Sequence, residues 1–149
     1  MEAATLSRTT AEGEIRALID RWAAAAKAQE LETVMACYTP DVLAFDAIGA
    51  LQFKGREAYR KHWETCFSYM PSGGEMIFDI SELAITTSQD LAYFHYIARC
   101  GGSCNGEEKI GWMRVTGVCR KSSGQWRIVH EHFSSPFDPM SGQVINTGP

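Results

Sequence analysis

Apolar and polar residues follow a helical period over the first 70 residues of the chain. Apolar side chains recur every three or four positions within 15–26, which predicts an amphipathic helix. Thr9 and Glu12 have the spacing of a capping box at the start of this helix. A second, shorter pattern of the same kind ends before Pro40, because proline removes a backbone donor that a continuing helix would need. The segment 56–67 predicts a third helix.

The period changes to that of β-strands after residue 70. One short strand is already predicted at 42–46, ahead of the third helix. Four longer β-rich segments follow, and turns rich in Gly, Ser, Asn and Asp separate them. These segments are 75–87, 90–100, 108–121 and 125–135.

This order of elements predicts an α+β fold. Three N-terminal helices would pack on one face of a strongly curved antiparallel β-sheet. The 149 residues fit one domain, 1–149, with its core at about 12–138. The tail 139–149 is polar and contains Gly and Pro, so we expect it to be loosely attached.

The charge balance is mild and excludes several classes of partner. The 14 basic and 18 acidic residues give a net charge of -4 and form no long block, so we expect neither a nucleic-acid partner nor a membrane partner. The chain begins without a signal-peptide pattern, and no stretch approaches the ~20 apolar residues of a membrane span. We therefore expect a soluble, cytoplasmic protein. Five cysteines are an odd number, which favours reduced thiols over a disulfide framework.

Three stretches of the chain carry a resemblance to a known superfamily: YTPDVLAFD, FKGREAYRKHWE and WMRVTGVCRKSSGQWRIVHEHFSSPFD. In order and spacing the chain resembles the nuclear-transport-factor-like superfamily of cone-shaped α+β barrels, over about residues 12–138. Within it, the chain is similar to the small bacterial SnoaL-like proteins, which are relatives of ketosteroid isomerases and polyketide cyclases. The resemblance implies a hydrophobic pocket between helices and sheet. It does not specify a reaction, because such folds host many unrelated functions.

Asp46 is the first candidate catalytic residue. The resemblance to the isomerase branch sets it where that family has its proton-shuttling aspartate. Asp46 also has the strand parity of Val42 and Ala44, so its carboxylate points inward if Val42 does. A buried carboxylate suits abstraction of a proton next to a carbonyl. The alternative is a turn aspartate that accepts backbone N–H bonds ahead of Gly49.

The oxyanion-binding donors of the isomerase branch are not matched. Trp22 stands where the isomerases carry a tyrosine donor, and no acid lies near Trp112 to serve as the second donor. Losing one aligned donor costs on the order of 100- to 1000-fold in turnover. Two functions stay open. One is a cofactor-independent isomerase or polyketide cyclase-like activity, transferring a proton on a hydrophobic carbonyl or aromatic compound. The other is a non-catalytic ligand-binding or association module.

His130 and His132 lie two residues apart in the last predicted strand. On a regular strand both share the face of Trp126 and Ile128, whereas Glu131 lies on the opposite face. With an unperturbed pKa near ~6.5, a histidine can donate or accept a proton at cellular pH. We interpret His132 as the acid partner of Asp46; simple packing is the alternative.

A His-x-His pair on a strand can also bind a metal ion. A catalytic zinc site needs a third protein ligand and an open position, and only His95 or Asp46 could supply that ligand. We therefore expect no metal.

Aromatic and polar side chains on the predicted inner faces are the candidate substrate-binding residues. They suit a flat, small hydrophobic or aromatic molecule that two or three hydrogen bonds orient, and core packing is the alternative for each. The chain has no glycine-rich phosphate loop, and we expect no cofactor. The candidate residues are Trp22, Tyr59, Trp63, His95, Trp112, Arg114 and His130.

Apolar residues also fall on the predicted outer face of the sheet. Val115, Val129 and Phe133 have this parity. An exposed apolar sheet face favours a twofold partner, so we expect a homodimer.

Overall fold

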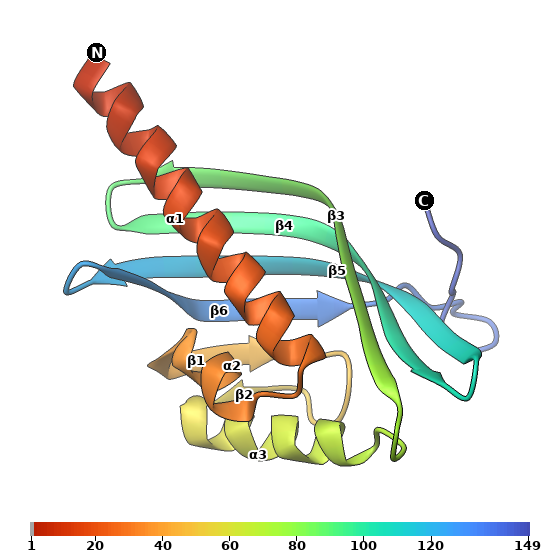
Figure 1. Cartoon of the computed structure of the whole chain (residues 1–149). Coiled ribbons are helices and arrows are strands. Elements are labelled where there is room, and N and C mark those ends of the chain that lie inside the picture. Colours follow the sequence, from red (N-terminus) through yellow and green to blue (C-terminus); the bar gives the residue numbers. More distant parts are fainter. Residues whose placement is uncertain (1) are drawn as a thin grey trace.

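The computed structural model describes residues 2–149, and it describes side chains from residue 10 onward. Three helices and six strands make an α+β fold (Figure 1). The helices are α1 (Glu2–Lys27), α2 (Leu31–Ala36) and α3 (Arg56–Ser68). The strands are β1 (Tyr38–Phe45), β2 (Phe53–Lys54), β3 (Glu75–Ser88), β4 (Leu91–Cys104), β5 (Glu107–Ser122) and β6 (Gln125–Ser134).

Helix α1 supplies much of the core, as its apolar spacing predicted. Ile15, Leu18, Ile19 and Trp22 are all buried, and the helix packs against β3 and β6 (Figure 1). The helix extends back to Glu2, so it does not begin at the predicted capping box. The side chain of Thr9 itself lies outside the described residues.

The sheet is mixed, which corrects the prediction of an antiparallel sheet. Its strand order is β2-β1-β6-β5-β4-β3. The β3 to β6 meander is antiparallel as predicted, but β1 pairs with β6 in parallel. The chain crosses from β1 through β2, α3 and the meander before β6 returns beside it, and this long connection permits parallel pairing. Helix α3 therefore follows two strands and covers β1, so only α1 and α2 precede the sheet.

A β-bulge in β6 changes which residues face the core. Val118 pairs with His130, whereas the next residue of β5, Cys119, pairs with Ile128, so Val129 is an extra residue in β6. An extra residue reverses the alternation of faces beyond it. Trp126 and Ile128 are buried before the bulge, and Glu131 and Phe133 are buried after it.

Two of the residues behind the homodimer prediction do not lie on the outer face of the sheet. Phe133 is buried and faces the core, and so does its partner Val115 on β5, instead of lying on the outer face. The homodimer stays a prediction without support from these two residues.

The C-terminal tail makes a few contacts with the rest of the protein, although nearly all of its residues are exposed. Phe137 forms an isolated bridge with Val144, and the backbone N–H of Ile145 donates to the carbonyl of Pro136. Gly148 lies against the Trp112 indole, where an added Cβ would come within 2.5 Å of the ring. No helix in residues 2–149 combines the length and apolar character needed to cross a membrane.

Candidate functional site

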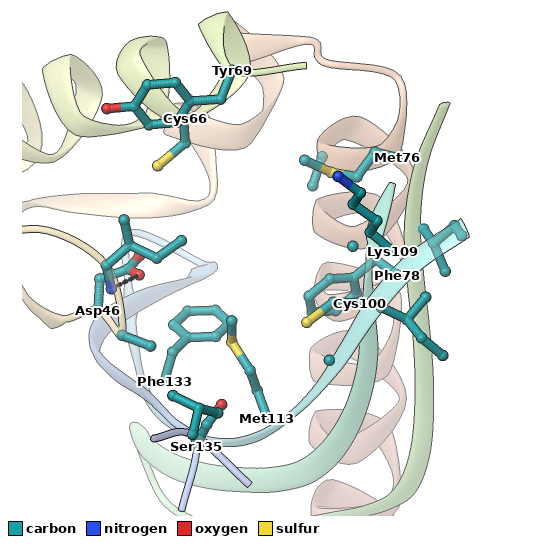
Figure 2. A pocket seen from close by; sticks show the side chains of 18 of the residues that line it. Asp46, Cys66, Tyr69, Met76, Phe78, Cys100, Lys109, Met113, Phe133 and Ser135 are labelled. Carbon is teal, nitrogen blue, oxygen red and sulfur yellow. Dashed lines mark hydrogen bonds between the residues drawn. The ribbon is translucent and has the colours of Figure 1, made fainter. Parts of the chain in front are cut away.

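A cavity of about 860 Å³ opens between α3, the loop after β1, the inner face of the sheet and the tail. This volume lies within the range of small-molecule sites, which is ~300–1,000 Å³. Figure 2 shows Asp46 at one side of the cavity and Phe78 with Cys100 at the other. The remaining wall contains aromatic and sulfur-containing side chains, small aliphatic residues, and four polar residues, Lys109, Ser134, Ser135 and Asn146. The aromatic and sulfur-containing residues are Trp63, Cys66, Tyr69, Met76, Met113 and Phe133.

Asp46 directly follows β1 and lies on the cavity wall. Val42 and Ala44 are fully buried, so the inward parity predicted for this carboxylate is confirmed. Its Oδ1 accepts a hydrogen bond from the backbone N–H of Ile48 at 3.1 Å, and its side chain is 12% exposed. The turn contact and the pocket position therefore coexist in one residue.

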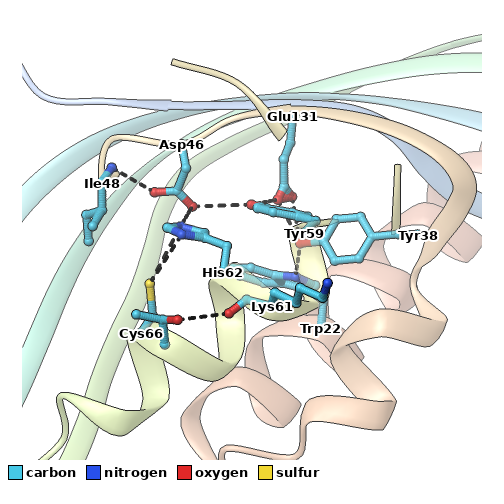
Figure 3. Close-up of polar contacts among 10 residues, drawn as sticks. Trp22, Tyr38, Asp46, Ile48, Tyr59, Lys61, His62, Cys66 and Glu131 are labelled. Carbon is cyan, nitrogen blue, oxygen red and sulfur yellow. Dashed lines mark hydrogen bonds and ion pairs between the residues drawn. The ribbon is translucent and has the colours of Figure 1, made fainter. Parts of the chain in front are cut away.

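The other oxygen of Asp46 meets two side chains of α3. The Tyr59 hydroxyl lies 3.3 Å from Oδ2, and His62 Nε2 lies 3.2 Å from the same oxygen. His62 is buried and stacks on Phe53, with ring centroids 4.1 Å apart. These contacts hold both the carboxylate and the imidazole in one orientation (Figure 3).

A buried polar cluster continues behind Asp46 (Figure 3). The Tyr38 hydroxyl donates to the Glu131 carboxyl group, 2.7 Å from Oε2 and 2.9 Å from Oε1. Tyr59 Oη lies 3.1 Å from Glu131 Oε2. Trp22 Nε1–H in turn donates to Tyr38 Oη at 2.7 Å. The cluster thus connects the cavity wall to the core through a continuous series of hydrogen bonds.

Burial dominates the electrostatics of this cluster. It raises the pKa of Glu131 to about 8; hydrogen bonds from Tyr38 and Tyr59 oppose the shift, and the charge of Asp46 adds to it. Burial, followed by the charge of Glu131, also raises the pKa of both phenols well above 10. Both tyrosines therefore keep their protons at neutral pH and serve as donors.

Cys66 lines the cavity one helical turn after His62, but it is not an activated nucleophile. Its Sγ lies 3.5 Å from His62 Nε2, on the same side of the ring as Asp46. Burial, then the charge of Asp46, raises the pKa of this thiol to about 11. A nucleophilic cysteine needs a lowered pKa and a base that a third group orients through its other nitrogen. The geometry fits acid–base chemistry at Asp46 better.

Comparisons with known proteins agree with this architecture. A sequence profile of the SnoaL-like domain matches residues 15–138. The chain belongs to the SnoaL-like family.

Solved structures place this SnoaL-like protein within the NTF2-like fold. An NTF2-like protein of unknown function from Pseudomonas putida is 41% identical, with a TM-score of 0.88 over 95% of this chain and 98% of the other. An NTF2-like protein with a cystatin-like fold from Novosphingobium aromaticivorans is 21% identical, with a TM-score of 0.75 over 89% and 86% of the two chains. A structure from Catenulispora acidiphila in complex with S-DNPA is 16% identical, with a TM-score of 0.75 over 85% and 94%. A search of curated proteins found no match.

The SnoaL-like protein brings only some of the predicted site residues to the cavity. Asp46 and Trp63 line it. Tyr59 and Trp22 lie behind the cavity wall and do not line the cavity. Both form hydrogen bonds within the buried polar cluster. The Trp22 indole N–H is fully used by Tyr38, so it does not replace the missing isomerase donor.

The other predicted residues lie on the outer face of the sheet. His132 is exposed and contacts the edge of Phe45, so it does not meet Asp46 in the cavity, and the predicted pairing is wrong. His130 points the same way and contacts the carbonyl of Leu43 through Nδ1 at 2.7 Å. The cause is the bulge at Val129, which turns both histidines outward and Glu131 inward.

Strand β5 and its neighbour β4 place three more predicted residues away from the cavity. His95 and Arg114 are exposed, and Arg114 Nε donates to Ser134 Oγ. Trp112 alternates with the cavity-lining Gly111 and Met113, so its indole faces outward beneath the tail. Within the described side chains, no three His, Cys, Asp or Glu residues gather in a way that could hold a metal ion.

Sequence reasoning singled out Tyr59 but missed His62 and Glu131, the two other polar groups of the cluster around Asp46. His62 shares the helical face of Tyr59 and Trp63, which a pattern of apolar residues does identify, but its proximity to Asp46 depends on how α3 packs on β1. Glu131 gave no usable signal, because regular alternation placed it outside.

Proposed function

We propose that this SnoaL-like protein binds a small, mostly apolar molecule in its cavity and transfers a proton on it, with Asp46 as the base. The reaction would be of the isomerase or cyclase type, on a hydrophobic carbonyl or aromatic compound, and would need no cofactor. The supporting observation is the position of Asp46. A carboxylate that three neighbours orient stands at the wall of a cavity with a largely apolar lining.

Each part of this geometry suits abstraction of a weakly acidic C–H proton. The low exposure of Asp46 reduces hydration of the carboxylate, which favours proton transfer over solvation. Tyr59 and His62 fix the Oδ2 oxygen, so the carboxylate needs little reorganisation as the proton moves. His62 takes the position of acid–base partner that the sequence assigned to His132.

The cavity lining supports a flat ligand. Trp63, Phe78 and Phe133 present aromatic surface, and Met113 supplies an adaptable apolar contact. A ligand with a carbonyl or hydroxyl at the Asp46 end would bury its apolar body against these residues.

A ligand-binding protein without catalysis is the second candidate, and one observation favours it. The Trp22 N–H, the nearest counterpart of the isomerase donor, is directed at Tyr38 inside the buried cluster. Without an aligned oxyanion donor, proton transfer on a bound carbonyl compound would be slower by on the order of 100- to 1000-fold. An association module is supported less well, because the interior contains a large cavity and not packed side chains.

Exchange of α-protons in D₂O tests the catalytic proposal without knowledge of the natural product. A panel of aryl and cyclic ketones is incubated with the protein, and loss of the α-proton signal is followed by NMR. We expect Asp46→Asn to slow exchange by roughly 10²- to 10⁴-fold, the usual contribution of a positioned base. Ligand binding, read from the tryptophan fluorescence of the protein, to which the cavity residue Trp63 contributes, should change little.

Two further variants serve as controls for this experiment. Asp90→Asn alters an exposed aspartate in the turn between β3 and β4, and His132→Ala alters the outer-face histidine; neither should change exchange. If Asp46→Asn exchanges protons as fast as the parent while still binding the ketone, Asp46 is not the base and the binding role is the better description.

A further inference from the structure

Glu131 is a fully enclosed carboxyl group, and no cationic side chain contacts it among residues 10–149. It is 2% exposed and lies on the inner face of β6, immediately after the bulge. The groups that interact with it among the described residues are phenols, thiols and one carboxylate, and none of them carries a positive charge. They are Tyr38 and Asp46 from β1 and its end, Tyr59 from α3, Tyr96 from β4, Cys119 from β5, and Cys37 before β1.

The hydrogen bonds of this cluster determine where each proton can lie. Tyr38 Oη accepts the N–H of Trp22, so its own proton is directed at Glu131. The Tyr59 hydroxyl has one proton and two possible acceptors, Glu131 Oε2 at 3.1 Å and Asp46 Oδ2 at 3.3 Å. Which acceptor receives it depends on the protonation of Glu131.

We propose that Glu131 is a positioning residue that carries a proton in the working state and thereby directs the Tyr59 hydroxyl toward Asp46. This proposal rests on the proposed function only where it takes Asp46 as the base. With Glu131 protonated, its O–H donates to Tyr59 Oη, and the Tyr59 proton is free to bond Asp46. With Glu131 ionised, both tyrosines donate to it, and Asp46 Oδ2 keeps only the contact with His62.

The two carboxyl groups have different roles in this arrangement. Asp46 touches the cavity and stays available as a base, whereas Glu131 lies in the core and holds its proton. The elevated pKa of Glu131, about 8 because of burial, agrees with this division. Ionisation of Glu131 would withdraw the Tyr59 proton and add a second negative charge beside Asp46.

Glu131→Gln is the decisive variant, since a glutamine amide donates and accepts like a protonated carboxyl group. At pH 7 we expect α-proton exchange within about fivefold of the parent, the size of one neutral hydrogen bond. The parent should lose activity as pH rises through about 8, and Glu131→Gln should not. Glu107→Gln, at an exposed glutamate of β5, serves as the matched control and should keep the parent profile. A loss of on the order of 100-fold at pH 7 in Glu131→Gln would show that an ionised acceptor is required, and would overturn the proposal.

NMR of the unaltered protein tests the same inference without any turnover. In ¹³C-labelled protein, the carboxyl resonance that is missing from Glu131→Gln should titrate at about pH 8. The Tyr59 ring carbon bonded to oxygen should shift over the same pH range in the parent and stay constant in Glu131→Gln. If the Glu131 carboxyl carbon already has the chemical shift of the ionised form at pH 6, the proposal is refuted, even if Asp46 is the base. If no ketone exchanges but both resonances titrate together, the proposed function fails and the proton assignment stands.

Discussion

Glu131→Gln is expected to raise the free energy of unfolding by several kcal/mol at pH 9 and to change it little at pH 4. The reason is a difference in proton binding between the two states. In the unfolded chain a glutamate ionises near its ordinary pKa of 4.5, whereas burial in the folded protein raises the pKa to about 8. Between these values the unfolded chain releases a proton that the folded protein retains.

The sign follows from linkage. Because the folded pKa is the higher one, the stability that Glu131 contributes is fully present below pH 4.5 and is lost as pH rises toward 8, after which it is constant. The loss is ~1.4 kcal/mol for each pH unit in this window, so it reaches on the order of 5 kcal/mol. Glutamine does not titrate, so Glu131→Gln removes the part of the pH dependence of stability that comes from this residue.

Urea denaturation of both proteins from pH 4 to 9 measures this effect. The difference between them should grow through the window and become constant above about pH 8. Glu107→Gln, at an exposed glutamate on the neighbouring strand, should follow the parent at every pH. A difference that is the same at pH 4 and pH 9 would mean that folding does not change the pKa of Glu131.

Phe133→Ala is expected to cost roughly 3–5 kcal/mol of stability, which is typical of truncating a buried phenylalanine. Phe133 is buried after the bulge, its ring lies 6.0 Å from that of Trp22, and it forms part of the cavity wall. The substitution removes this contact and enlarges the cavity toward the core. Thermal and urea unfolding followed by circular dichroism provide the measurement.

Phe137→Ala is the matched control, since Phe137 is 61% exposed on the same segment of chain. We expect it to change stability by no more than about 0.5 kcal/mol, as is usual for surface positions. His132→Ala should be equally mild. If His132→Ala were severe and Phe133→Ala harmless, β6 would lack the bulge and its faces would be the reverse of those described.

Several elements of the protein follow from local patterns alone. The structure confirms the helices predicted from the apolar spacing of α1 and α3, and the strands predicted from the alternation in β3 to β5. These predictions succeed because an element with one buried face has apolar residues at the period of that element. Asp46 was found in the same way, since Val42 and Ala44 fix its face.

The location of the remaining site residues could not be predicted from such patterns. Alternation assumes a regular strand, and a single extra residue at Val129 exchanged the positions of His132 and Glu131. No local feature of the sequence marks this bulge, because its register depends on pairing with β5 and β1.

The sequence by itself determined the secondary structure, the family and the inward carboxylate of Asp46. Only the tertiary structure decided that β1 runs parallel to β6, that His62 stands beside Asp46, and that Glu131 lies buried behind Tyr59. The physical reason is the separation of the residues along the chain. Side-chain periodicity indicates which face of a single helix or strand is buried. These contacts instead join residues that are distant in sequence and meet only when α3 and β6 pack around β1.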